Sequence, residues 1–447
     1  MSTPATSTID DAEPCTLPTL TEGAELVGEF KGSGYREPPQ LVSLPNRQLV
    51  RLPPLLFQVV KALHDHRHLA GTIDPRIALD AVATEVSRAA GARISGEQVL
   101  FLVDRKLAPL GVTTYSNGAR PQLVKPDTFL GLRFKLAVFP ESATWILAGL
   151  FSWLFTPVAM IFAFAAVFLS EVWVLGTQSV GDALHRAILA PESILMVLGL
   201  AIASCVFHEI GHAAACRYSG VRPGVMGCGI YLVWPAFYTD ITESYRLGRG
   251  GRIRTDLGGV YFNGIFLVGL TLVYLQTGFQ PLLLVILTVN FEIIQQLLPT
   301  LRFDGYYIIS DLVGIPDLFK YIKPILRRTL LRRAADERLK ALKRWPQMIV
   351  TLWVLTVIPA LAFQLTLIAV RVPELVVSDW RMIEGLGRAA AAGAGPLQLI
   401  TAGLQILLLI LPLLGLALLA YRLVRWLVVK AVRYVQGPAP EPALPGA

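Results

Sequence analysis

The chain is poor in charged residues and in cysteine. Charged side chains make up 16% of its 447 residues, whereas soluble domains carry about 25%. Its four cysteines, at positions 15, 205, 216 and 228, show no paired spacing, so we predict no disulfide framework. The N-terminal residues MSTPATSTIDDAEPC lack both a basic start and an apolar core, so we expect no secretory signal peptide.

Long apolar runs account for the low charge. Hydrophobic residues make up 54% of the chain, and the mean hydropathy is +0.55. A transmembrane helix needs roughly 20 apolar residues to cross about 30 Å of hydrocarbon. Six runs are long enough: 144–170, 193–216, 257–277, 280–299, 347–370 and 397–420. The sequence therefore predicts a predominantly α, polytopic membrane protein with about six transmembrane helices.

Basic residues mark one side of these runs. They gather in residues 217–254 and 320–344. The opposite loops 171–192 and 278–279 have few basic residues, and in the loop 371–395 the basic residues are matched in number by acidic ones. By the positive-inside rule, the basic segments and both termini are expected in the cytosol of a multi-pass cell-membrane protein. The net charge of +8 is then a topology signal. No nucleic-acid partner is expected, because the basic residues flank spans instead of forming one face interleaved with aromatic residues.

The N-terminal part has no such run, and we expect a soluble domain over residues 21–135 after a disordered tail over 1–20. The stretch RQLVRLPP predicts a strand. Three amphipathic helical patterns follow, the third capped by Ser95. Together with VTTYSNGARPQLV, this order favours a small winged-helix-like α/β domain. The membrane domain is expected over 140–430, followed by a Pro-rich tail over 431–447.

Three roles are open for the N-terminal domain. Its order of elements resembles the peptide-recognition domains that act in the maturation of ribosomally made, modified peptides. A structural cap or a dimerisation module is the alternative. A DNA-binding winged helix is disfavoured by the modest basic content of the stretch.

The second run ends in ASCVFHEIGHAAAC, which places ionisable side chains at membrane depth. Such groups are costly there and usually carry function. His208 and His212 share one helix face at i and i+4, so their imidazoles can bind one Zn²⁺. Glu209 is then placed to act as general base on a water. A chance match is the alternative, disfavoured because unpaired ionisable groups are rare inside spans.

A catalytic zinc needs a third protein ligand and an open position. Two residues are candidates: Asp304 in LLPTLRFDGYYIISD and Glu292 in NFEIIQQ. Pro299 breaks the helix and lets the chain turn, so that Asp304, followed by the permissive Gly305, can point back to the histidines. We therefore prefer Asp304, with Glu292 as the alternative ligand.

The joint order of HEIGH, GVMGCGIYLVWPAFYTD, NGIFL and LLPTLRFDGYY, within about residues 193–317, resembles the site-2 protease family of intramembrane zinc metalloproteases, in its peptide zinc metalloprotease branch. The resemblance implies His208, His212 and Asp304 as zinc ligands and Glu209 as catalytic acid/base. The chain departs from the family at two places. Before the Pro of the last motif it has QQLL, where the family commonly has an Asn, and ahead of Asn263 it has GGV, where many relatives have Gly-Pro. For Asn263 we expect substrate binding, with a helix–helix hydrogen bond as the alternative.

These observations lead to one expected function and one competing class. We expect an intramembrane zinc endopeptidase that cleaves a peptide or membrane-associated protein near the cytosolic face, with a leader-bearing precursor of bacterial modified-peptide maturation as substrate. The apolar stretch 225–238 is expected to offer a strand edge to an extended substrate, or else to be a re-entrant packing loop. The competing class is a non-hydrolytic transporter, immunity protein or tethered regulator that retains the metal site.

Overall fold

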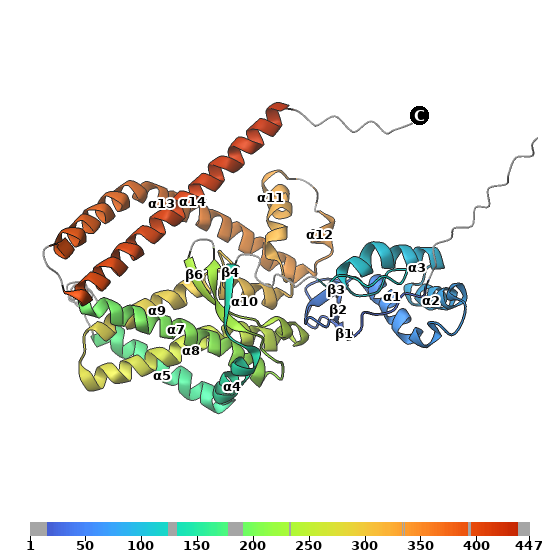
Figure 1. The fold of residues 1–447 in the computed structure, drawn as a ribbon, viewed down its shortest axis with the longest axis horizontal. Helices are drawn as coiled ribbons and strands as arrows, with labels where there is room; N and C mark the ends of the chain where they lie inside the picture. Colours follow the sequence, from blue (N-terminus) through green and yellow to red (C-terminus); the bar gives the residue numbers. More distant parts are fainter. Residues whose placement is uncertain are drawn as a thin grey trace, which may run out of the picture.

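A computed structural model describes residues 16–123, 132–177, 191–231, 234–332, 334, 336–391 and 395–436. The described chain is mostly helical, as the composition predicted. Figure 1 shows the N-terminal domain at one end, a group of apolar helices with a small sheet at the other, and two long helices, α13 and α14, above the apolar helices in this view.

The N-terminal domain is a three-stranded antiparallel sheet followed by three helices. Its elements are β1 (Glu25–Glu29), β2 (Gln40–Ser43), β3 (Leu49–Leu52), α1 (Pro54–Asp65), α2 (Pro75–Ala90) and α3 (Gly96–Leu102). The predicted strand and the three predicted helices are confirmed as β3, α1, α2 and α3, and Ser95 caps α3 in a capping box with Gln98. The short strands β1 and β2 were not predicted, because β1 has no clear alternation of apolar and polar residues.

The folded part of this domain begins before residue 21. The backbone of Thr16 donates to Ser116, and Leu20 forms an isolated β-bridge with Thr113. Residues 16–20 therefore pair with the stretch that follows α3. They belong to the folded domain and not to the disordered tail expected over residues 1–20. Residues 1–15 lie outside the described residues.

The described residues contain five helices that are long and apolar enough to cross a membrane, not six. They are α5 (Pro157–Thr177), α7 (Pro191–Tyr218), α8 (Arg249–Thr277), α13 (Arg344–Ala391) and α14 (Pro396–Gln436). The remaining expected span, 280–299, is α9 (Pro281–Leu297), whose 17 residues extend only about 26 Å. The first expected span is broken: α4 (Glu141–Phe151) ends before Pro157 starts α5, since proline lacks the N–H that a continuing helix needs.

The stretch expected to form a strand edge is a β-hairpin. Strands β5 (Met226–Tyr231) and β6 (Trp234–Thr239) pair antiparallel, and β4 (Leu132–Phe139) adds to the other side of β5, so the order is β4-β5-β6. Because β4 starts at Leu132, the predicted boundary of the N-terminal domain at residue 135 falls inside a strand that belongs with the apolar helices.

Beyond α9, short helices precede the two long ones. These short helices are α10 (Asp304–Val313), α11 (Ile322–Leu330) and α12 (Glu337–Lys340), and α10 packs with α11 and the start of α13 around Tyr306 and Trp353. The expected loop 371–395 is helical up to Ala391. Good helix formers continue there beyond the apolar run, with an Arg371–Glu374 ion pair of 3.3 Å on the helix surface.

Candidate metal centre

Two histidines of α7 bring their ring nitrogens together. His208 and His212 are 4% and 6% exposed, and their Nε2 atoms lie 3.1 Å apart. The pair occupies one face of the helix, as the i and i+4 spacing predicted. Nδ1 of His212 contacts the backbone oxygen of Thr255, in α8, at 2.7 Å. A protonated Nδ1 donates in this bond and leaves Nε2 free to bind a metal.

Asp304 reaches the histidines through the turn between α9 and α10. Leu298 is extended, as expected of a residue before proline, and α10 begins at Asp304, where an acidic side chain in the first turn is favourable. Gly305 lies against the end of α9: a Cβ there would stand 2.1 Å from the backbone oxygen of Leu297. The expected roles of Pro299 and Gly305 in directing Asp304 are consistent with this turn.

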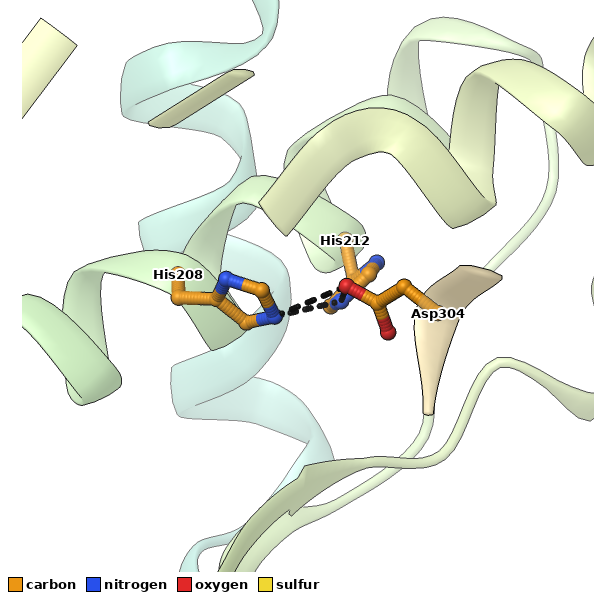
Figure 2. Close-up of side chains that lie close together, drawn as sticks. All are labelled: His208, His212 and Asp304. Carbon is orange, nitrogen blue, oxygen red and sulfur yellow. Dashed lines mark hydrogen bonds and ion pairs between the residues drawn. The ribbon is translucent and has the colours of Figure 1, made fainter. Parts of the chain in front are cut away.

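The three side chains converge on one point (Figure 2). Oδ2 of Asp304 lies 3.1 Å from Nε2 of His208 and 3.5 Å from Nε2 of His212. Among the described residues, these three form the one group of three or more His, Cys, Asp or Glu side chains whose ligand atoms all lie within 4.8 Å of one another. Glu292 does not belong to it. The structure thus brings together the three residues predicted as ligands and leaves the alternative ligand outside.

The donor set fits a zinc ion. Zinc bonds of about 2.0–2.1 Å in a tetrahedral site place ligand atoms about 3.3 Å apart, and the distances here are 3.1, 3.1 and 3.5 Å. Oδ2 of Asp304 and Nδ1 of His208 are buried and make no hydrogen bond within the described part of the chain. Burial raises the pKa of Asp304, but the adjacent His212 and His208 outweigh it and hold that pKa below its usual range. Positive charge beside the carboxylate therefore keeps it ionised; protonated histidines supply that charge here, and a metal ion would supply it in their place.

Gly259 of α8 leaves the space that His208 occupies. A Cβ at this position would lie 2.4 Å from Nε2 of His208, which is closer than any side-chain contact allows. The sequence alone did not single out Gly259 or Thr255. The signal for the glycine is its place in a GG pair within an apolar helix, where small residues permit close approach; nothing in the sequence marks a backbone oxygen such as that of Thr255.

Glu209 is held by the sheet. The hydroxyl of Thr239, the last residue of β6, donates to Oε2 of Glu209 over 2.7 Å and lies 3.0 Å from its backbone oxygen. Glu209 is partly exposed, unlike the two histidines that flank it. Sequence reasoning missed Thr239, because the pairing of β6 with α7 is a tertiary contact between residues 30 positions apart.

Asn263 lies on α8, one turn beyond Gly259, and is 2% exposed. Its Oδ1 accepts a hydrogen bond of 3.4 Å from the hydroxyl of Ser204 on α7. In the structure this side chain therefore links two helices, which is the alternative raised from the sequence. Its predicted role in substrate binding stays a prediction.

Comparison with known proteins gives one partial relative. Over 122 residues the chain is 26% identical to a Bacillus subtilis (strain 168) protein named "Putative peptide zinc metalloprotease protein YydH". The match covers 27% of this chain and 48% of that protein, so it spans about half of the relative's length. No protein-family model matches the chain, and no solved structure matches it.

Proposed function

We propose that the protein is a membrane-embedded zinc metallopeptidase of the site-2 protease type. The observation that carries the proposal is the convergence of His208, His212 and Asp304, with Glu209 next to the first ligand in the chain. The partial similarity to a protein named as a peptide zinc metalloprotease supports the same class. The five long apolar helices support a place in the membrane, which we propose to be the cell membrane of a bacterium. We propose that the shorter apolar helix α9 is a sixth crossing, so that both termini lie in the cytosol.

Each residue of the centre has a role in this proposal. Zinc held by the three ligands would polarise a scissile carbonyl and lower the pKa of a water. Glu209 would act as general base on the attacking water and would pass the proton to the leaving amine. Thr239 holds Oε2 of Glu209 at 2.7 Å, which fixes the carboxylate in one orientation while its other oxygen remains to receive the proton.

The sheet supplies a place for the substrate. A helical peptide has its carbonyls in internal hydrogen bonds, so the cleaved segment must be extended. Strand β6 is an edge strand of the described sheet, and it ends at Thr239, in contact with Glu209. We propose that a peptide or membrane-protein segment adds to β6 by β-augmentation and thereby carries its scissile bond past the carboxylate.

The substrate we propose is a leader-bearing precursor of a modified peptide, captured by the N-terminal domain. The support is the sheet-then-three-helices order of that domain, which fits the resemblance to peptide-recognition domains. The competing proposal, a transporter, immunity protein or tethered regulator with a retained metal site, predicts metal binding without hydrolysis.

Metal analysis tests the ligand set. Purified protein is expected to hold about one zinc per chain. Asp304→Ala should lose most of the metal, whereas Glu292→Ala, a matched removal of a nearby carboxylate, should retain it. Retention in Asp304→Ala together with loss in Glu292→Ala would show that the third ligand is wrongly assigned.

A further inference from the structure

Residues 30–36 of the N-terminal domain, which we term the docking segment, contact the helices that carry the metal centre. The docking segment lies between β1 and β2. Elsewhere the domain is joined to the rest of the chain by the ion pairs Glu25–Arg246 and Arg47–Glu141. Backbone hydrogen bonds join Gly34 to Gly314 (3.1 Å) and to Lys343 (2.9 Å), and join Arg36 to Ala341 (2.8 Å). The docking segment is therefore bonded to the end of α10 and to the chain that leads into α13, about 300 residues away in the sequence.

Arg252 of α8 joins the docking segment to α10. Its side chain is fully buried, and its Nε donates to Oδ1 of Asp311 over 2.9 Å. Its Nη1 donates to the backbone oxygens of Lys31 (2.9 Å) and Leu247 (2.8 Å). The guanidinium also lies over the ring of Phe30, 4.4 Å from its centroid. This one side chain of α8 thus contacts the docking segment, the turn before α8 and α10 at once.

A guanidinium suits this position better than an ammonium does. Its rigid fork of five donors can meet acceptors in several directions, and the contacts to Asp311, Lys31 and Leu247 use two of its nitrogens. A buried ion pair contributes little net stability once desolvation is counted. The stronger reason for its presence is geometric, because it fixes how α8 lies against α10.

The same two helices carry parts of the metal centre. Thr255, whose backbone oxygen contacts His212, follows Arg252 by three residues on α8. Asp304 precedes Asp311 on α10 by seven residues (304 to 311), which is about two turns. A shift of α8 against α10 would therefore change the distance between the partner of His212 and the carboxylate of Asp304.

We propose that Arg252 is a positioning residue for the metal centre, and that the docking segment of the N-terminal domain holds it in place. The N-terminal domain is then a structural support of the metal site in addition to any role in binding peptide. This inference rests on the proposed function in one respect: it takes zinc as the metal that His208, His212 and Asp304 bind. It also means that deleting the whole N-terminal domain would perturb the metal centre, so point variants are the appropriate test.

The first arm of the test compares two arginines of α8. Arg254 lies two residues from Arg252 but faces Tyr218 and Ser219, so Arg254→Gln is the matched control for Arg252→Gln. Zinc affinity is measured by competition with a chelator on the full-length protein in detergent. Loss of a residue that supports metal ligands typically lowers metal affinity 10–100-fold, and we expect a loss of about that size for Arg252→Gln only.

The second arm perturbs the contact between the docking segment and the end of α10 without changing a residue of α8 or α10. A Cβ on Gly34 would stand 2.1 Å from the backbone oxygen of Val313, whereas Gly250 has open space around it. Gly34→Ala should weaken zinc binding in the same direction as Arg252→Gln, and Gly250→Ala should not. Visible absorption of the Co²⁺-loaded proteins reports ligand geometry, and it should change in Gly34→Ala and Arg252→Gln but not in the two controls.

Three outcomes decide the matter for variants that remain monodisperse. Weaker zinc binding with an altered Co²⁺ spectrum in both test variants supports the proposal. Affinities within twofold of the unchanged protein in both would overturn it, and a loss in Arg252→Gln alone would overturn the part played by the docking segment. Arg252→Lys serves as a second variant if Arg252→Gln does not fold. Absence of zinc binding by the unchanged protein would instead contradict the proposed function.

Discussion

The hydroxyl of Thr239 donates to Oε2 of Glu209 over 2.7 Å, and this bond joins the end of an edge strand to the candidate catalytic carboxylate. The two residues come from elements of different kinds, β6 and α7. Because a peptide added to β6 would run beside Thr239, the bond gives a physical link between substrate binding and the orientation of Glu209.

Removing this hydroxyl should slow the reaction without releasing metal. Thr239→Val keeps the shape of the side chain but leaves Oε2 of Glu209 without its donor. We expect kcat to fall by about tenfold or more, as for other groups that orient a catalytic residue, with zinc content unchanged. Thr239→Ser, which keeps the hydroxyl, should retain most of the activity. Equal rates for Thr239→Val and the unchanged protein would show that the bond has no part in catalysis.

The space beside His208 gives a steric prediction. In Gly259→Ala the new Cβ would lie 2.4 Å from Nε2 of His208, so the imidazole must move. We expect zinc affinity to fall by about tenfold or more, measured by chelator competition. Gly269→Ala, on the same helix with open space around it, is the control and should bind zinc normally. Unchanged affinity in Gly259→Ala would argue against Nε2 as the metal-binding atom.

An exposed aromatic residue tests peptide capture by the N-terminal domain. Phe101 of α3 is 60% exposed, so its ring lies on the surface of the domain and is accessible to a peptide. Phe101→Ser should raise KM for a full precursor peptide severalfold and leave cleavage of a short peptide spanning the scissile bond unchanged. Glu97→Gln, on the same helix, is the control. An equal KM for the precursor in both variants would remove Phe101 from the capture surface.

The orientation of the chain can be read with a reporter that is active only in the cytosol. The basic residues between α10 and α13 predict activity for a fusion after Lys340. Because α13 continues to Ala391, the informative outer position is Gly395, between α13 and α14, where the reporter should be silent. The reverse pattern would place the metal centre near the outer face and contradict a cytosolic N-terminal domain.

The sequence was most informative where function constrains local spacing. The i and i+4 histidines of HEIGH predicted two imidazoles on one face, and the structure places their Nε2 atoms 3.1 Å apart. Pro299 and Gly305 predicted a turn that returns Asp304 to them, and Oδ2 of Asp304 lies 3.1 Å from His208. In each case a rule about helix geometry or helix breaking applies to a few neighbouring residues.

The sequence was least informative where distant segments meet. The pairing of β4 with β5 joins Ala137 to Gly227, and the docking of Gly34 on Gly314 joins residues still farther apart. Such contacts depend on the complementarity of two surfaces, which no local pattern of apolar and polar residues encodes. The length of α9 was a different kind of miss: its apolar run has the composition of a span, but the helix ends at Leu297, two residues before Pro299.

The most direct test of hydrolysis is the replacement of Glu209 by glutamine, which keeps the size and polarity of the side chain but removes the base. Cleavage is measured on fluorogenic peptides and on transmembrane-segment peptides in liposomes, and zinc content is measured on the same preparations. The proposed function predicts about one zinc per chain in both proteins and cleavage by the unchanged protein that falls about a hundredfold or more in Glu209→Gln. Zinc-loaded protein that cleaves none of these peptides, or cleavage that is equal in Glu209→Gln, would contradict it.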